Sequence, residues 1–152
     1  MSQPLPQKPL IRQLKPTMEA LGVVLSFICR SPPYAEFRAA KIIKAVQHQL
    51  STGCHVCLIE DERLVAYAGW LPVDEAEAER WIEVDINLHP VPSAMTDAAA
   101  LTIVSVRSSR EIPQLIRACR QQAAQRRIYF KRNYAGGRVR KSRVRDRKQP
   151  GS

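Results

Sequence analysis

Two apolar segments separated by only three polar residues constrain the fold of this chain more than any other feature. Cys54–Glu60 and Leu64–Leu71 have the length and composition of strands, and Asp61, Glu62 and Arg63 lie between them. A polar turn this short joins two such strands as a hairpin. The middle of the chain therefore predicts a β-hairpin, and the overall fold depends on the segments that flank it.

Two helical patterns precede this hairpin. Apolar residues recur at helical spacing over Met18–Cys29, with Thr17 as the predicted N-cap. A second apolar stripe predicts a helix over about Ala35–Leu50, followed by Gly53 as a C-terminal cap. The segment Ser31–Tyr34 ends the first helix, because residues that precede proline avoid the helical region.

Beyond the hairpin, the pattern changes from acidic to apolar. The alanine-rich, acidic segment Asp74–Glu79 is expected to be a loop or a helical turn. Ala99–Val106 predicts a strand, Ile112–Ala124 a helix, and Ile128–Phe130 a short strand. This order predicts one α/β (α+β) domain with a central, mostly antiparallel sheet flanked by helices.

Both ends of the chain differ in composition from its middle. Residues 1–16 include four prolines and predict a flexible, extended leader. Residues 17–134 are the predicted domain, and residues 135–152 are a basic tail with few apolar side chains. The densest apolar run, Ala20–Cys29, is too short to span a membrane and lacks the flanks of a signal peptide, so we expect a cytoplasmic protein.

Charge is unevenly distributed along the chain. Residues 1–106 hold nine basic and twelve acidic residues, a balance of −3, whereas residues 107–152 hold fifteen basic and two acidic, a balance of +13. Such a basic region attracts nucleic acid, an anionic membrane, a phosphorylated cofactor or an acidic protein, and charge alone does not choose among them. The candidate partner-binding residues are Arg126, Arg127, Lys131, Arg132, Arg138, Arg140 and Lys141.

Short motifs for metal binding or catalysis are weak in this sequence. Cys54, His55 and Cys57 suggest a metal, but zinc sites usually need two separated pairs of ligands, and no second pair has that spacing. Alternation along a strand also places Cys54 and Cys57 on opposite faces, so we expect no metal site. His89, in a loop after Asp85, is a candidate general base. The sequence contains no Walker-type loop and no Gly-x-Ser-x-Gly elbow.

Several segments occur in an order that is known from one protein family. They are Leu21–Leu25 followed by Cys29-Arg30-Ser31-Pro32-Pro33-Tyr34, the hairpin Val56–Trp70 that ends in a small residue and Trp, the strand Leu101–Val106, the helix Glu111–Arg120, and Gly136-Gly137-Arg138. In their order and spacing, over roughly residues 18–145, they resemble the RTX toxin-activating lysine acyltransferases.

The resemblance implies a variant of the GNAT acyltransferase fold in a cytoplasmic, often dimeric protein. Members of that family transfer a fatty acyl group from acyl carrier protein to lysine ε-amines of a protoxin. The resemblance thus implies acyl carrier protein or acyl-CoA as co-substrate, no tightly bound cofactor, and a protein or peptide as acceptor. The basic C-terminal third suits the acidic surface of acyl carrier protein.

The catalytic pair of that family does not recur here. The family's histidine follows Ser-Pro-x, where this sequence has Tyr34, and the family's strand aspartate falls at Val104, beside Ser105. With a pKa of about 10, tyrosine is a poor base but a candidate general acid for the leaving thiol. Ser31 is a candidate donor to a developing oxyanion. The candidate catalytic residues are Tyr34, Ser31 and Ser105.

Three functions remain open at this point. The chain is an acyltransferase with a rearranged site, a non-catalytic relative that binds acyl carrier protein or a protein target, or a nucleic-acid-binding protein that uses its basic C-terminal third. Whether it is an enzyme depends on which of these holds. A homodimer that pairs through a sheet edge is a further expectation.

Overall fold

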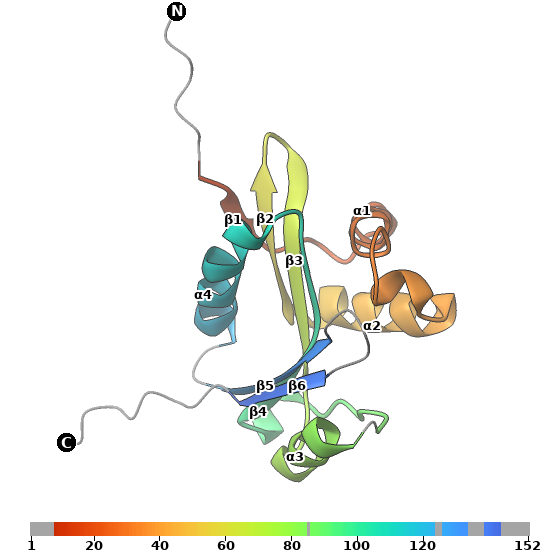
Figure 1. Ribbon diagram of the computed structural model, residues 1–152, viewed down its shortest axis with the longest axis vertical. Coiled ribbons are helices and arrows are strands. Elements are labelled where there is room, and N and C mark those ends of the chain that lie inside the picture. Colours follow the sequence, from red (N-terminus) through yellow and green to blue (C-terminus); the bar gives the residue numbers. More distant parts are fainter. Residues whose placement is uncertain (1–7, 85, 124–125, 134–138, 144–152) are drawn as a thin grey trace, which may run out of the picture.

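A computed structural model describes residues 8–84, 86–123, 126–133 and 139–143 of the chain. Within these residues the chain forms one six-stranded sheet with helices on both faces (Figure 1). The strands are β1 (Leu10–Arg12), β2 (His55–Glu60), β3 (Arg63–Pro72), β4 (Ala98–Val106), β5 (Arg127–Asn133) and β6 (Val139–Arg143). The helices are α1 (Met18–Ile28), α2 (Ala39–Thr52), α3 (Glu75–Glu83) and α4 (Ile112–Gln122), with short 3₁₀ helices η1 (Tyr34–Glu36), η2 (Ser93–Met95) and η3 (Ser109–Glu111).

The strands follow one another across the sheet in chain order, from β1 to β6. Every neighbouring pair is antiparallel except β4 and β5, which are parallel and are joined through α4. A parallel pair needs such a crossover, because the chain must return to the end of the sheet where the first strand begins before it forms the second strand. The predicted fold class, a mostly antiparallel sheet flanked by helices, is confirmed.

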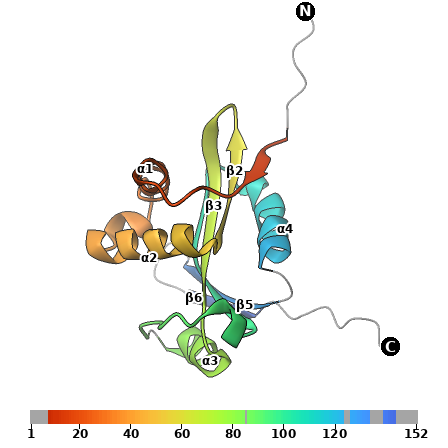
Figure 2. The ribbon, with the colours of Figure 1, turned by 180° about the vertical axis from the view of Figure 1, so that it is seen from behind.

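Helices cover the two faces of the sheet in different places. α4 packs on one face, α1 and α2 pack on the other, and α3 lies at the far end near the start of β4 (Figures 1 and 2). Each helix closes an apolar cluster: Leu115 lies in the α4 cluster, Val24 in the α1–α2 cluster, and Ala78 in the α3 cluster. Cys54 and Cys57 belong to different clusters, so the predicted alternation of their faces is confirmed.

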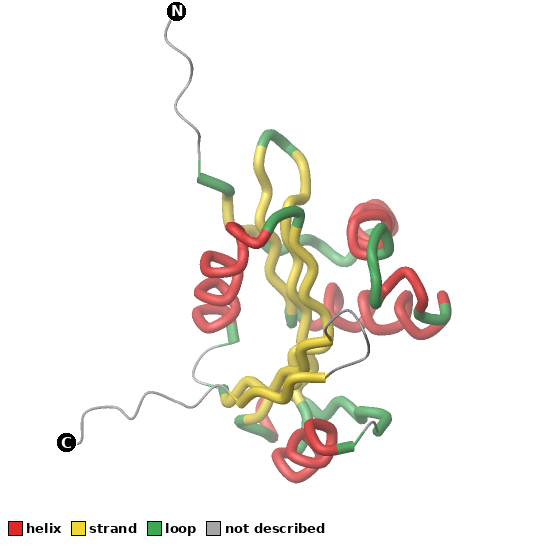
Figure 3. The backbone as a smooth tube through the Cα atoms, viewed as in Figure 1, coloured by secondary structure: helices red, strands yellow, loops and turns green. Residues whose placement is uncertain are grey.

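The β2–β3 hairpin forms as the sequence predicts. Figure 3 shows it extending past the ends of the other strands. Its turn residues Asp61 and Glu62 have φ values of 50° and 61°, which are left-handed conformations. Two successive left-handed residues are typical of the tight turns that match the twist of paired strands. Glycine or asparagine adopts this conformation with less strain than glutamate does.

The first two helices match their predictions in part. Thr17 caps α1, its Oγ1 accepting the Ala20 N–H at 3.0 Å, and Gly53 ends α2 with a left-handed φ of 71°. The second helix was expected to begin at about Ala35, and this was wrong. Residues 34–36 form η1 and Phe37 is extended, so the chain turns once more before α2 begins at Ala39.

The acidic segment after the hairpin forms a longer helix than was expected. The prediction was a loop or a helical turn over Asp74–Glu79, whereas α3 extends to Glu83. Ala78 and Ile82 are its buried residues, and they lie four positions apart on one face. Two small apolar anchors among glutamates give too weak a periodic pattern to reveal a helix.

The ends of the described chain take part in the sheet. Leu10–Arg12 were expected in a flexible leader, but they form the edge strand β1 against β2. The Gln13 side-chain amide anchors this segment by donating to the carbonyls of Gly53 and His55, at 2.8 and 2.9 Å. Val139–Arg143, expected in a basic tail, pair as β6 with β5. The other limits of leader and tail stay predictions.

Candidate functional site at the parting of β4 and β5

The two parallel strands pair over only part of their length. Ala98–Leu101 of β4 pair with Arg127–Phe130 of β5. Beyond this point β4 continues to Val106 and β5 continues to Asn133, but the register between them ends. Ligands of α/β sheets bind beyond the carboxyl ends of parallel strands. The candidate site is therefore the place where β4 and β5 part, which we call the β4–β5 gap.

A bulge in β4 coincides with this parting. Gly69 of β3 lies opposite Ile103 and Trp70 lies opposite Leu101, so Thr102 has no residue opposite it. An extra residue in one strand bends that strand and increases its twist. The bulge thus turns the end of β4 immediately after its last pair with β5.

The backbone of Val104 faces the β4–β5 gap. The Arg107 N–H donates to the Val65 carbonyl at 2.8 Å. In an antiparallel pair alternate residues bond to the partner strand, so Ser105 bonds to β3 and Val104 does not. The N–H and C=O groups of Val104 therefore point away from β3, toward the side that β5 has left.

The Tyr34 side chain satisfies both of these backbone groups. Its hydroxyl donates to the Val104 carbonyl at 3.1 Å and accepts the Val104 N–H at 2.8 Å. Tyr34 comes from η1, between α1 and α2, and its ring packs edge-on against Phe37 with centroids 5.6 Å apart. A phenol from a distant loop thus stands where a paired strand would otherwise bond.

The environment of Tyr34 favours its neutral form. Burial raises the pKa of the Tyr34 phenol, and the hydrogen bond from the Val104 backbone lowers the pKa by a smaller amount. The hydroxyl therefore keeps its proton at neutral pH, and it is a proton donor rather than a base. A general acid must hold a proton in this way, and the acid role of Tyr34 stays a prediction.

The structure brings two of the three candidate catalytic residues to the same strand end. Tyr34 contacts Val104, and Ser105 is the next residue on β4, 8% exposed and opposite Tyr67 of β3. Ser31 is exposed, and its backbone carbonyl accepts the Ala35 N–H at 3.2 Å. The catalytic roles of Tyr34, Ser31 and Ser105 stay predictions.

A buried polar cluster behind the gap was missed from the sequence. Gln49 of α2 is fully buried, accepts the Tyr67 hydroxyl at 2.8 Å, and donates to Thr102 Oγ1 at 3.0 Å. Gly69 makes room for it, because a Cβ at Gly69 would lie 1.9 Å from Gln49 Oε1. A glycine inside a strand often marks a bulge or a close approach, and this was the available signal.

His55 has a structural role next to this cluster. Its Nδ1 lies 3.0 Å from the Gln49 carbonyl, and its Nε2 accepts the Leu14 N–H at 2.8 Å. The proton therefore sits on Nδ1, and burial lowers the pKa of the imidazole. Both ring nitrogens of His55 thus have hydrogen-bond partners within the protein. Burial also raises the pKa of the nearby Cys57 thiol to about 12, which disfavours the thiolate that a metal requires.

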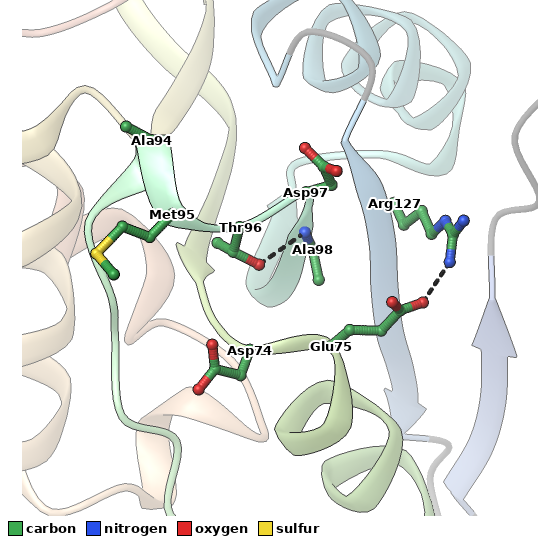
Figure 4. A pocket seen from close by; sticks show the side chains of 8 residues that line it. All are labelled: Asp74, Glu75, Ala94, Met95, Thr96, Asp97, Ala98 and Arg127. Atoms are coloured by element: carbon green, nitrogen blue, oxygen red, sulfur yellow. Dashed lines mark hydrogen bonds and ion pairs between the residues drawn. The ribbon is translucent and has the colours of Figure 1, made fainter.

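A shallow cavity lies at the opposite end of β4 (Figure 4). Its volume is about 360 Å³, and its lining includes Asp74, Asp97 and the ion-paired Glu75 and Arg127. It adjoins Ala98, where β4 begins, whereas Tyr34 bonds near the end of β4. The candidate base His89 is 82% exposed, and its Nδ1 lies 3.0 Å from Glu77 of α3.

Among the candidate partner-binding residues whose side chains the structure describes, Arg126, Arg127 and Lys131 have contacts within the protein. Arg126 donates to the Thr96 carbonyl at 2.6 Å, Arg127 pairs with Glu75, and the Lys131 ammonium lies 4.6 Å from the Trp81 ring centroid. The others are Arg132 of β5, Arg140 and Lys141 of β6, and Arg138, which lies outside the described residues. Binding of an acidic partner by this set stays a prediction.

Comparison with solved structures identifies the fold. The structure is similar to polyamine N-acetyltransferase from Drosophila melanogaster, with 13% identity, a TM-score of 0.58, and coverage of 84% of this chain and 77% of that one. The GNAT-like decarboxylase GphF in complex with isobutyryl-CoA gives 15% identity, a TM-score of 0.56, and coverage of 84% and 67%. The PaiA N-acetyltransferase from Thermoplasma acidophilum in complex with coenzyme A gives 10% identity and a TM-score of 0.53, with coverage of 84% of this chain and 80% of that one.

These similarities show that the chain has the GNAT fold. No protein-family model matches the sequence, and a search of curated proteins finds no match. The finer resemblance to toxin-activating acyltransferases therefore stays a prediction. Among the helices of the described residues, none has the length and apolar character needed to cross a membrane.

Proposed function

We propose that this protein transfers an acyl group from a thioester to a primary amine, with the β4–β5 gap as its active site. The observation that carries the proposal is the pair of Val104 backbone groups, which face the gap and bond to Tyr34 instead of to a strand. The GNAT fold adds support, because two of the similar structures hold coenzyme A or an acyl-CoA.

The residues of the gap suit the stabilisation of an oxyanion. The amine nitrogen attacks the thioester carbonyl carbon, a C–N bond forms, and negative charge develops on the carbonyl oxygen. A preorganised backbone N–H directed at that oxygen stabilises the transition state. In our proposal the Val104 N–H is this donor, and Ser105 shapes the strand end beside it.

Tyr34 supplies the proton for the leaving group. When the C–S bond breaks, the sulfur takes the electron pair and receives the Tyr34 hydroxyl proton. The tyrosinate then takes the proton that the new amide nitrogen must lose, so the enzyme returns to its starting state. The raised pKa of Tyr34 fits this order of proton transfers, because a neutral phenol starts the cycle and its anion is a strong base.

Tyr34 must shift before a thioester carbonyl uses the Val104 N–H. The N–H already bonds to the Tyr34 hydroxyl at 2.8 Å, and one donor does not serve two acceptors fully. In our proposal the thioester carbonyl oxygen replaces the Tyr34 hydroxyl as the acceptor of the Val104 N–H. The hydroxyl then stays close enough to donate its proton to the sulfur. This exchange predicts that Tyr34 weakens thioester binding while it speeds the chemical step.

The finer substrate assignments follow from the sequence resemblance. We propose a lysine ε-amine of a protein or peptide as acceptor, with an RTX-type protoxin as one candidate. The donor is fatty acyl carrier protein or acyl-CoA, and the basic C-terminal third is the proposed surface for acyl carrier protein. A homodimer is part of the same proposal.

Thiol release from an acyl thioester tests the proposal. Purified protein is incubated with acyl carrier protein or coenzyme A carrying a long acyl chain, plus an amine acceptor. Tyr34→Phe is compared with Tyr129→Phe, a matched control that removes a hydroxyl bonded to Glu75 and Glu79 on the α3 side. Turnover that falls in Tyr34→Phe and persists in Tyr129→Phe supports the proposal.

The other outcomes separate the remaining functions. Binding of a thioester without turnover, unchanged in Tyr34→Phe, would make the protein a non-catalytic carrier-binding relative. Neither binding nor turnover, together with salt-sensitive binding of DNA or RNA that is lost on removing residues 135–152, would identify a nucleic-acid-binding protein.

A further inference from the structure

Phe37 is a large aromatic residue that the fold does not bury. Its side chain is 38% exposed, and it belongs to none of the three apolar clusters that the described residues form. It is nevertheless held in place. The ring packs edge-on against Tyr34 at 5.6 Å, and the Phe37 N–H donates to the Tyr34 carbonyl at 3.2 Å. An aromatic ring is thus fixed directly beside the proposed proton donor.

A cation occupies the face of this ring. The Lys41 ammonium lies 5.4 Å from the Phe37 centroid, within the distance at which an aromatic ring attracts a cation. Lys41 is in the first turn of α2, which contains no acidic residue and whose N-cap is Arg38. The positive end of a helix repels a cation. The helix field disfavours any ammonium at this place, so the attraction of the ring is what holds Lys41 there. An ammonium from outside must displace Lys41 to reach the same ring face.

We propose that the face of Phe37 is the docking subsite for the acceptor, which it binds as a primary ammonium on an aliphatic chain, and that Lys41 fills this subsite in the free protein. The place of this subsite in catalysis rests on the proposed function. The bound ammonium lies one aromatic ring away from Tyr34. It gives its proton to water as it moves on toward Val104, because only the neutral amine attacks a thioester.

Binding is measured without any thioester. Protein with ¹³C-labelled phenylalanine rings is titrated with Nα-acetyl-lysine amide, and with Nα-acetyl-norleucine amide, which lacks the charge. We expect the lysine compound alone to shift the Phe37 signals. Lys41→Gln should bind it about twofold more tightly, and Phe37→Leu should bind it about two- to fivefold more weakly. Equal shifts from both compounds, or no response in Lys41→Gln, would overturn the proposal.

Kinetics then connect the subsite to turnover. Phe37→Leu should raise the KM for the amine about two- to fivefold, whereas Phe37→Trp should keep or lower the KM, because indole attracts cations more strongly. An unchanged KM in Phe37→Leu would refute the role in catalysis. If no variant consumes a thioester, the proposed function fails, and the titration still decides whether the subsite binds an ammonium.

Discussion

Replacing Gly69 with alanine tests whether the polar cluster behind the gap holds β3, β4 and α2 together. The added Cβ would lie 1.9 Å from Gln49 Oε1 and 2.3 Å from Gln49 Cδ, which is too close for any real contact. Gln49 must therefore turn away. It then loses its bonds to the Tyr67 hydroxyl and to Thr102 Oγ1, and the bulge of β4 loses its support.

The magnitude follows from the groups that lose their partners. The buried Tyr67 hydroxyl is left without its partner, at a cost of about 1–3 kcal/mol, whereas Thr102 Oγ1 keeps the Gly69 carbonyl as its acceptor at 3.4 Å. The overpacking adds about 1–3 kcal/mol. We expect Gly69→Ala to lower the free energy of unfolding by about 2–6 kcal/mol, and to lower the melting temperature by about 4–24 °C.

Urea unfolding of four proteins measures this effect: the wild type, Gly69→Ala, Gln49→Ala and the double variant. In the Gln49→Ala background the new methyl group enters vacated space, so we expect Gly69→Ala to cost less than about 1 kcal/mol there. Equal costs in both backgrounds would refute the reasoning. Gly22→Ala on α1 is a matched control, because its Cβ has no neighbour within 4 Å and alanine favours a helix.

Three further predictions follow from described contacts. Burial lowers the pKa of His55, and its neutral Nε2 must accept the Leu14 N–H. The free energy of unfolding should therefore be highest above pH 6.5 and should fall as the pH drops toward the lowered pKa. Urea unfolding between pH 5 and 8 measures this dependence. The measurement is made in His48→Gln as well, because burial also lowers the pKa of His48. A free energy of unfolding that does not change with pH would contradict the role of His55. Glu62→Gly should raise the melting temperature by a few degrees in a thermal scan, because glycine adopts its φ of 61° without strain; no rise would mean that the turn is unstrained. Tyr34→Phe should lower kcat about a hundredfold and also lower the KM for the thioester, because it removes the proton donor and frees the Val104 N–H; a higher KM would contradict the exchange we propose.

Much of the fold follows from patterns that lie within single segments. Thr17, Gly53 and the turn at Asp61 and Glu62 are local signals, and each marks an element boundary that the structure contains. Local patterns failed where tertiary contacts decide the outcome. The edge strand β1 depends on Gln13, whose side-chain amide reaches backbone carbonyls some forty residues away in the sequence.

The candidate site was predictable only in part, for a similar reason. The resemblance led to Tyr34, and the structure places its hydroxyl on Val104, seventy residues away. Gln49 was hidden because a polar residue on a helix is usually exposed, and only Gly69 opposite it makes room for its burial. Neither residue reveals the other unless their strand and helix are already known to be neighbours.

The short pairing of β4 with β5 divides the sheet into two unequal parts. Strands β1 to β4 form a continuous antiparallel body. Strand pairing joins β5 and β6 to that body at only four residue pairs, from Ala98 with Arg127 to Leu101 with Phe130, although Ile128 and Tyr129 are also buried in the apolar clusters. We expect this pairing between β4 and β5 to open at a lower free energy than the pairing between the other strands. In native-state hydrogen exchange, we expect the amides of Ile128 and Phe130 to exchange well before those of β3. Opening of this pairing would widen access to the place where β4 and β5 separate, while the four-stranded body stays intact.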